Sequence, residues 1–325
     1  MHALTFNGEL KLTEKYPTPS PQPGEALIRV KVTGVCNTDI ELMKGYMQFQ
    51  GVPGHEFVGL VERAPGAEEW EGRRVVGEIN ADCGDCPTCR AGRPTHCPNR
   101  TTLGIAGRDG AFAEYLTLPV RNLLPVPDSL PDEIAIFTEP LAAACEILQQ
   151  VHIHPTDRVV VLGDGKLGLL CAQTVALTGC NLIAVGHHQE KLAILAQQGI
   201  STALGDSTSL TDLQSGADIV IESTGHPGGY AAAQRFIHPQ GVIVLKSTYH
   251  NSLDAKDVNL TGIVVDEVTL VGSRCGPFAP ALRLLERGLV KVAPLIHARY
   301  TFSDALAAFE RAAQPGTLKV LVDQD

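Results

Sequence analysis

Hydrophobic and polar positions follow two different patterns along the chain, and the change comes near Pro140. Before it, short apolar runs are separated by residues that favour turns, which predicts a mainly β region. The run at 26–32 alternates near its end, as a strand with one buried face does. After Pro140, runs rich in β-branched residues alternate with helical segments. This alternation predicts a doubly wound parallel sheet of the Rossmann type, with helices on both faces.

The same pattern gives the expected elements. In the first region we expect strands within 1–35 and at 58–63, 73–77 and 112–117, a short helix beginning at Cys36, and a lobe without periodicity at 80–102. In the second region the expected strands are 158–162, 181–185, 218–222, 242–245 and 268–271. The expected helices are 142–148, 167–177, 190–198, 230–236, 280–287 and 303–313, the last with a candidate cap at Ser303 or nearby. The tail from about residue 292 leaves the alternation, so we expect it to return to the first domain.

Length and composition narrow the class of protein. A chain of 325 residues exceeds the usual size of one hydrophobic core, which predicts two domains. A net charge of -10, with no block of Lys or Arg, argues against nucleic acid or an anionic membrane as a partner. No apolar run approaches the length of a membrane span, and the N-terminal residues lack the features of a signal peptide. We therefore expect a cytoplasmic protein that acts on a small molecule.

Four of the cysteines lie close together in the sequence: Cys83, Cys86, Cys89 and Cys97. In a reducing compartment this spacing indicates a metal site rather than a disulfide framework. Four thiolates can close a tetrahedron around zinc and leave no open position, so we expect this zinc to be structural. An iron–sulfur cluster also uses four cysteines, and four unrelated thiols on a loop are the remaining alternative.

A glycine-rich loop, GDGKLG at 163–168, follows the expected strand 158–162 and opens the expected helix. This context favours a dinucleotide-binding loop. Gly163 would allow the tight turn, Gly165 would let the pyrophosphate approach the backbone, and Gly168 would let helix and strand pack closely. The helix N-terminus would then face the phosphates. The alternative is a glycine-rich turn that binds no ligand.

The end of the next expected strand bears on the choice of nicotinamide cofactor. An NAD site usually ends this strand with an acid that holds the ribose 2′-hydroxyl. Here the strand runs into Gly186, His187 and His188, with no acid to repel a 2′-phosphate. Gly186 leaves room, and His187, His188 and Lys191 could donate to the phosphate. These residues favour NADP. The alternative is that the histidines are solvated and the enzyme uses NAD without the acidic anchor.

A third set of residues is Cys36, His55, Glu56 and Glu139. Both glutamates stand among apolar residues, and a metal ion is a common compensator for such buried charge. Sulfur, imidazole and carboxylate together suit zinc with an open fourth position. Asp39 could hydrogen-bond the outer nitrogen of His55 and orient it. The alternative for His55 is a hydrogen-bonded core histidine in a tight turn.

Five ordered motifs resemble the zinc-dependent medium-chain alcohol dehydrogenases over essentially the whole chain. They are Gly34-Val35-Cys36-Asn37-Thr38-Asp39, Pro53-Gly54-His55-Glu56, the four-cysteine lobe, Thr138-Glu139-Pro140-Leu141 and the loop at 163–168. The glutamate version of the fourth motif resembles the polyol, sugar and threonine dehydrogenase branches. The resemblance implies a mainly β, GroES-like catalytic domain at 1–145 with its zinc lobe at 80–102, an inserted dinucleotide-binding domain at 146–288, and a return of 289–325 to the first domain.

The resemblance also implies roles for single residues. Cys36, His55 and Glu139 would bind the catalytic zinc, Glu56 would enter the shell when the metal shifts, and Thr38 would pass a proton towards solvent. Many members place a histidine three residues beyond that hydroxyl, where this chain has Glu41. Besides the loop glycines and the corner at 186–191, the residues assigned to the cofactor are Lys166, Leu167, Ser223, Thr224, Lys246, Ser247, Gly272, Ser273 and Arg274.

We therefore expect an enzyme with a catalytic and a structural zinc, working as a homodimer or homotetramer. It would transfer a hydride between an alcohol or polyol, or its aldehyde or ketone, and NADP, with an NAD-linked polyol, sugar or threonine dehydrogenase as the alternative. Lys246 and Arg274 favour an anionic or highly polar substrate, unless both face solvent or the cofactor. A zinc-free enone or quinone reductase is disfavoured because the metal ligands are present. A non-catalytic interaction protein is disfavoured because few basic residues flank the cysteine lobe.

Overall fold

The computed structural model describes residues 1–205, 216–248 and 259–324, and Asp325, at the end of the expected tail, lies outside them. The chain divides into two compact units. The first comprises Met1–Glu139 and Phe278–Asp325, and the second comprises Pro140–Pro277. Each unit has its own sheet. Among the described residues, every helix is too short or too polar to cross a bilayer.

A seven-stranded sheet organises the first unit, in the order β10-β5-β4-β3-β18-β17, with β9 also paired to β3. Its strands are β3 (Glu25–Val35), β4 (Glu56–Arg63), β5 (Arg74–Gly77), β9 (Tyr115–Pro119), β10 (Leu123–Pro125), β17 (Ile296–Thr301) and β18 (Lys319–Asp323). Its neighbours are antiparallel except β17 and β18, which run parallel. Leu321 of β18 pairs with Gly34 of β3, so the C-terminal strand lies beside the one that leads into Cys36.

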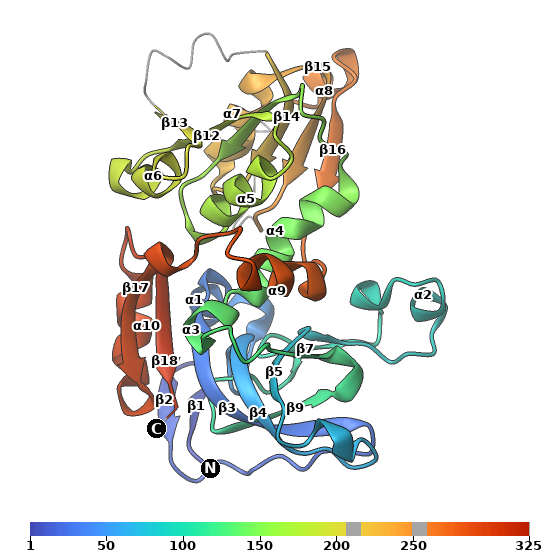
Figure 1. The fold of residues 1–325 in the computed structure, drawn as a ribbon, viewed down its shortest axis with the longest axis vertical. Helices are drawn as coiled ribbons and strands as arrows, with labels where there is room; N and C mark the ends of the chain where they lie inside the picture. Colours follow the sequence, from blue (N-terminus) through green and yellow to red (C-terminus); the bar gives the residue numbers. More distant parts are fainter. Residues whose placement is uncertain (206–215, 249–258, 325) are drawn as a thin grey trace. The chain divides into compact units, whose positions relative to one another are not determined.

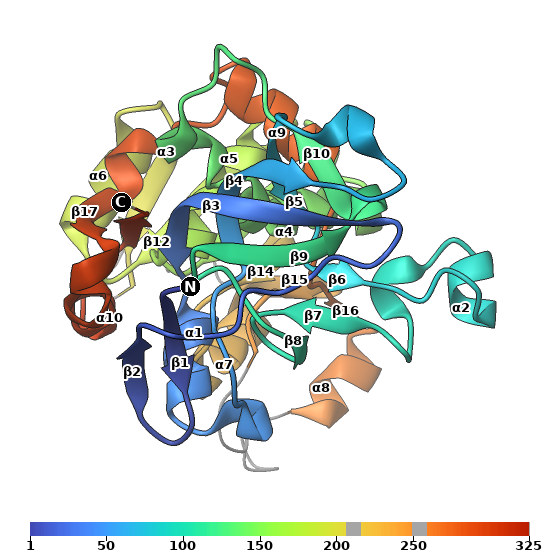
Figure 2. The ribbon, with the colours of Figure 1, turned by 90° about the horizontal axis from the view of Figure 1, so that it is seen from below.

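Smaller elements complete this unit. The strands are the hairpin β1 (Ala3–Phe6) and β2 (Leu10–Thr13), and β6 (Asn80–Ala81), β7 (Thr101–Leu103) and β8 (Gly107–Arg108), which form a three-stranded sheet. The helices are α1 (Asn37–Met43), α2 (Pro87–Arg90), α3 (Asp132–Ala135), α9 (Phe278–Glu286) and α10 (Ala305–Ala313). Figures 1 and 2 show the lobe that carries α2 extending away from the large sheet. In the core, the rings of Phe112 and Phe309 meet edge to face with centroids 4.8 Å apart, which fastens α10 to the unit.

The second unit is a six-stranded parallel sheet in the order β13-β12-β11-β14-β15-β16. Its strands are β11 (Arg158–Leu162), β12 (Asn181–Gly186), β13 (Ser201–Leu204), β14 (Ala217–Glu222), β15 (Ile237–Leu245) and β16 (Thr269–Gly272). The helices are α4 (Thr138–Gln150), which begins in the last residues of the first unit, α5 (Lys166–Ala176), α6 (Gln189–Ala196), α7 (Pro227–Phe236) and α8 (Leu260–Val265). Figure 1 shows helices on both faces of this sheet. Counted from β11, the strand order is 3-2-1-4-5-6, the doubly wound order of dinucleotide-binding domains.

The parallel sheet confirms the expected Rossmann-type architecture, and most elements lie within a few residues of their expected ranges. Two expectations were wrong in detail. The strand expected at 112–117 begins only at Tyr115, because Phe112 and Ala113 pair with the N-terminal strand: Leu4 N–H donates to Phe112 O at 2.8 Å. The helix expected to start at Ser303 starts at Ala305, because Phe302–Asp304 form a 3₁₀ turn instead.

Candidate functional site

Cys36 stands at the N-terminus of α1, where β3 ends. Its backbone N–H donates to Oδ2 of Asp39 at 2.8 Å, so the aspartate three residues on fixes the first turn of the helix. Asp39 is fully buried. The hydroxyl Oγ1 of Thr38 lies 3.8 Å from Sγ of Cys36. The local fold therefore places the thiol of Cys36 beside the hydroxyl of Thr38 and close to the buried carboxylate of Asp39.

His55 and Glu56 come together at the start of β4, and both are buried. Nδ1 of His55 lies 3.3 Å from Oδ1 of Asp39, which leaves Nε2 of the ring for another partner. Burial lowers the pKa of His55, but the Asp39 carboxylate, helped by Cys36, outweighs it and holds that pKa well above its ordinary value. Asp39 thus faces the imidazole at ion-pair distance, and its role in orienting the ring stays a prediction.

Glu56 makes a buried ion pair with Lys319, the first residue of β18. Nζ of Lys319 donates to Oε2 of Glu56, and each side chain is only 1% exposed. The ammonium also lies 5.7 Å from the ring centroid of Phe137. Gly34 makes room for the pair, since a Cβ there would stand 2.5 Å from Oε2. The second oxygen, Oε1, is buried, and no hydrogen bond is found for it among the described residues.

Glu139 lies at the start of α4, after Thr138, whose hydroxyl donates to the carbonyl of Ala135 at 2.6 Å. Glu139 keeps partial contact with solvent. Enclosure by the protein raises the pKa of Glu139 to about 7; the charge of His55 opposes this rise and that of Glu56 adds to it. Glu139 is therefore close enough to the pair at 55–56 to interact with both charges.

Ligand atoms of Cys36, His55 and Glu56 lie within 4.8 Å of one another, which is the spacing of groups that share a metal ion. Glu139 lies outside this tight group, although its charge acts on it. A cation would satisfy the unbonded Oε1 of Glu56, and sulfur, imidazole and carboxylate together suit zinc. The residues present therefore fit the metal that the sequence predicts.

The four cysteines of the lobe also converge. Sγ of Cys97 lies 3.5 Å from Sγ of Cys83 and 3.8 Å from that of Cys86, which lies 3.5 Å from Sγ of Cys89. Zinc–sulfur bonds of about 2.3 Å place the sulfurs of a tetrahedral site about 3.8 Å apart. The N–H of Cys89 donates to Sγ of Cys86, which lowers the pKa of Cys86 to about 7. The N–H of Asn99, a residue that sequence reasoning missed, donates to Sγ of Cys97 at 3.3 Å.

The glycine-rich loop joins β11 to α5 at the carboxyl end of the parallel sheet. Gly163 has φ +118°, a left-handed value that favours glycine, and a Cβ there would meet Ser223 at 2.8 Å. A Cβ on Gly168 would lie 2.1 Å from the Gly163 carbonyl oxygen, so helix and loop touch at this residue. Around Gly165 a Cβ would meet no atom within 4 Å, which leaves the backbone open to a ligand. The loop therefore fits a pyrophosphate as predicted.

The corner at the end of β12 differs from its expected chemistry. We expected this corner to be free of acid, and that expectation is wrong. The carboxylate of Asp164, from the glycine-rich loop, accepts the backbone N–H groups of His187 and His188 at 2.6 and 2.7 Å. Burial raises the pKa of Asp164, but the hydrogen bonds from His188 and His187 outweigh it and lower that pKa, helped by the charge of the buried Lys191.

The remaining predicted cofactor residues lie at the carboxyl ends of β14, β15 and β16. Ser223 donates from Oγ to the Leu162 carbonyl at 2.7 Å. Nζ of the buried Lys246 donates to Oγ of Ser273 at 3.0 Å and to the carbonyl of Arg274 at 2.6 Å. Lys246 therefore ties the ends of β15 and β16 together through two hydrogen bonds to neutral acceptors.

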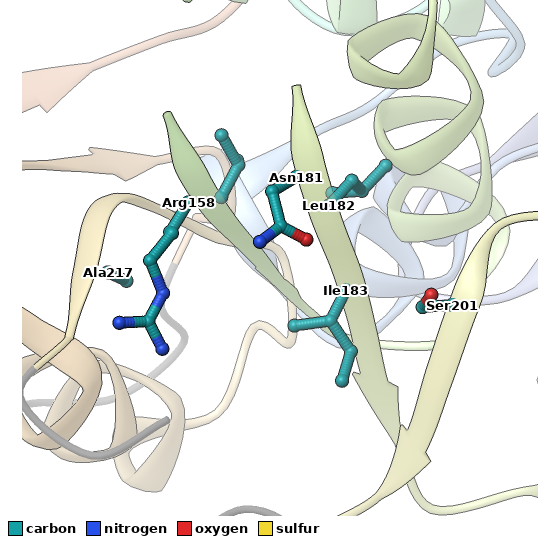
Figure 3. A pocket seen from close by; sticks show the side chains of 7 residues that line it. Arg158, Asn181, Leu182, Ile183, Ser201 and Ala217 are labelled. Atoms are coloured by element: carbon teal, nitrogen blue, oxygen red, sulfur yellow. The ribbon is translucent and has the colours of Figure 1, made fainter. Parts of the chain in front are cut away.

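A cavity at the opposite edge of the parallel sheet, at the amino ends of β11, β12, β13 and β14, is a separate feature. Figure 3 shows the side chains that line it. They are Arg158, Val159, Asn181, Leu182, Ile183, Ser201 and Ala217, from the first residues of four strands. Doubly wound sheets bind ligands at the carboxyl ends of their strands, so this cavity is not the dinucleotide site.

Family profiles cover most of the chain. The alcohol dehydrogenase GroES-like domain matches residues 22–128. The glucose dehydrogenase C-terminus matches residues 133–324. The chain belongs to the zinc-dependent medium-chain alcohol dehydrogenase family. This membership confirms the resemblance seen in the sequence and the predicted enzyme class, an oxidoreductase of the alcohol dehydrogenase type.

Relatives of this dehydrogenase include enzymes and solved structures. The L-threonine 3-dehydrogenase of Xanthomonas campestris pv. campestris (strain B100) is 34% identical over 232 residues, 67% of this chain and 68% of the relative. A protein of Sinorhizobium meliloti 1021 described as a zinc-binding dehydrogenase, solved bound to NADP, has TM-score 0.89 and 27% identity over 99% of this chain and 98% of its own. An alcohol dehydrogenase (rspB) of Escherichia coli CFT073, complexed with NADH, has TM-score 0.90 and 25% identity over 99% of both chains.

Besides Asn99, two residues near the predicted zinc and dinucleotide sites were not found from the sequence. Lys319 gives a signal in retrospect, because it is a charged residue that opens the apolar run Lys319-Val-Leu-Val near the C-terminus. Asp164 stands inside the glycine-rich loop itself, but nothing in its spacing shows that it reaches the end of β12.

Proposed function

We propose that this dehydrogenase transfers a hydride between a primary or secondary alcohol or polyol, or the matching carbonyl compound, and a nicotinamide dinucleotide. The observation that carries the proposal is the convergence of Cys36, His55 and Glu56 within 4.8 Å, with the charge of Glu139 acting on them. Thiolate, imidazole and carboxylate are the ligands of catalytic zinc sites that keep a position open for substrate.

The two glutamates would have different roles at this site. Lys319 already balances the charge of Glu56, which makes Glu56 the weaker zinc ligand. No ion pair is found for Glu139 in the described parts of the chain, so its carboxylate has more to gain from a cation. Cys36, His55 and Glu139 would therefore hold the ion, with Glu56 nearby. A bound zinc would supply a Lewis acid for the alcohol oxygen and lower its pKa.

The neighbouring residues would orient the zinc ligands and transfer protons. Asp39 would hold the His55 ring through Nδ1 and keep Nε2 directed at the ion. Thr38, with Oγ1 3.8 Å from the Cys36 sulfur, would take the proton of the substrate hydroxyl and pass it towards solvent. Where many members of the family have a histidine that completes the relay, this chain has Glu41. The Glu41 carboxylate accepts a hydrogen bond from Nζ of Lys44 at 2.9 Å.

The two units would bind different groups. We assign the catalytic zinc and the structural zinc of the cysteine lobe to the first unit and the dinucleotide to the carboxyl ends of β11–β16 in the second. The second unit also supports assembly into a homodimer or homotetramer. Its edge strand β16 pairs only with β15 in the described sheet and leaves Leu270 40% exposed.

A panel of alcohols and polyols, assayed with NAD and with NADP by the absorbance of the reduced nicotinamide, tests the proposal alongside a zinc count. Cys36→Ser and His55→Ala should abolish turnover and remove one of the two zinc sites. Cys180→Ser, which replaces a partly buried thiol of the second unit, is the matched control and should leave both unchanged. An inactive wild-type protein that holds zinc only in the cysteine lobe would refute the proposal.

A further inference from the structure

Asp164 occupies the place where dinucleotide-binding domains discriminate between NAD and NADP. Its Oδ2 accepts the N–H groups of His187 and His188 and lies 3.0 Å from Nδ1 of the His188 ring. Oδ1 lies 3.2 Å from the same Nδ1. The side chain is only 10% exposed. A carboxylate with this many donors on one oxygen is held firmly in place.

Gly186 is the residue that allows this position. A Cβ on Gly186 would lie 2.5 Å from both Cβ and Oδ2 of Asp164. The missing side chain at the end of β12 therefore makes room for the carboxylate of the loop rather than for a 2′-phosphate. The chain supplies the acid from Gly163-Asp164-Gly165 instead of from the strand that ordinarily carries it.

Two physical consequences follow for a bound dinucleotide. The backbone N–H groups that would bind a 2′-phosphate already donate to a carboxylate, and that carboxylate would repel the added negative charge. Within the described residues, Oδ1 has only the longer contact with His188, so it keeps acceptor capacity for a ribose hydroxyl. Both consequences favour the dinucleotide without the phosphate.

We propose that Asp164 is a specificity-determining residue that selects NAD(H) over NADP(H) in this dehydrogenase. The inference rests on the proposed function, because it assumes that the second unit binds a nicotinamide dinucleotide. It replaces the sequence-based expectation of NADP, which depended on a corner without acid.

The test is a binding measurement that needs no turnover. Isothermal titration of the zinc-loaded enzyme with NADH and NADPH, and with 5′-AMP and adenosine 2′,5′-bisphosphate, should show tighter binding of the ligands that lack the 2′-phosphate. Asp164→Asn keeps the size of the side chain and removes its charge. It should shift the ratio of the two dissociation constants towards the 2′-phosphorylated ligand by about tenfold or more.

Asp157→Asn is the matched control, because Asp157 lies in the same unit next to the amino end of β11 and accepts the N–H of His154 at 2.7 Å. It should leave the ratio unchanged. A wild-type preference for the 2′-phosphorylated ligands, or an unchanged ratio in Asp164→Asn, overturns the inference. Failure of the wild type to bind either dinucleotide refutes the proposed function instead. If Asp164→Asn does not fold, as judged by circular dichroism, the wild-type comparison of the two adenosine phosphates still decides.

Discussion

Lys319 donates to Glu56 next to Gly34, and this contact joins the last strand of the first unit to the residue beside His55, which we propose as a zinc ligand. The two partners are 263 positions apart in the sequence. Because β18 pairs with β3 and β3 pairs with β4, the three strands bring them together at one level of the sheet. The C-terminal strand therefore sets the charge balance of a site whose predicted ligands come from the first half of the chain.

Lys319→Met should destabilise the first unit strongly. Removing one partner of a buried ion pair leaves the other charge uncompensated and typically costs about 3–5 kcal/mol. Urea unfolding at neutral pH measures the loss. Lys11→Met is the control, because Lys11 pairs with Glu9 on the surface, where such pairs contribute about 1 kcal/mol or less. The double variant with Glu56→Gln should recover part of the loss, and strictly additive effects would show that the pair is not coupled.

Glu139→Gln and Glu56→Gln together rank the two carboxylates as zinc ligands. We expect Glu139→Gln to lower the zinc content from about two ions per chain to about one, because it removes a carboxylate that forms no ion pair within the described residues. Glu56→Gln should retain both ions but lower stability, because it leaves the buried Lys319 ammonium without its partner. Zinc is counted by atomic spectroscopy after dialysis. The reverse result would make Glu56, which lies nearer to Cys36 and His55, the third ligand.

Asp39→Asn should lower the affinity of the proposed catalytic site for zinc without abolishing zinc binding. The carboxylate faces Nδ1 of His55, and loss of such an outer partner typically lowers metal affinity about 10–100-fold. Competition with a chromogenic chelator measures the affinity. Asp109→Asn is a suitable control, because Asp109 accepts from Tyr16 and from the Val52 N–H in the same unit but does not face the histidine. An equal loss in both variants would indicate general destabilisation rather than loss of orientation.

Local sequence patterns predicted the second unit well because its elements depend on near neighbours. The run 158–162 is apolar and β-branched, and the loop after it carries the glycines that a strand-to-helix turn requires. The expected range of this strand coincides with β11. Where an element depended on distant contacts, the prediction shifted, as at Phe112 and Ala113, which the N-terminal strand holds outside β9.

The two contacts that most affect the chemistry are long-range and could not be read from spacing. Asp164 accepts the N–H groups of His187 and His188, which follow it by 23 and 24 positions. Its carboxylate fills the space that we expected a ribose 2′-phosphate to occupy. Lys319 reaches across the whole chain to Glu56. Residue types alone suggested which side chains could bind zinc or dinucleotide. The folded structure was needed to show that Lys319 neutralises Glu56 and that Asp164 occupies the corner at the end of β12.

Cys97→Ser should release the zinc of the cysteine lobe and lower thermal stability while leaving the catalytic zinc in place. Cys97 is fully buried, and its sulfur lies 3.5 and 3.8 Å from those of Cys83 and Cys86, so it belongs to the four converging thiols that we expect to hold the ion. Metal bound by such a site contributes directly to folding. Differential scanning calorimetry should show a loss of about 5 °C or more in the unfolding midpoint, since about 1 kcal/mol corresponds to about 2–4 °C in a domain of this size. Cys171→Ser, at a buried thiol of the second unit, tests whether any buried cysteine gives the same loss. A lobe that retains its zinc or an unchanged midpoint in Cys97→Ser would show that the fourth thiolate is not needed.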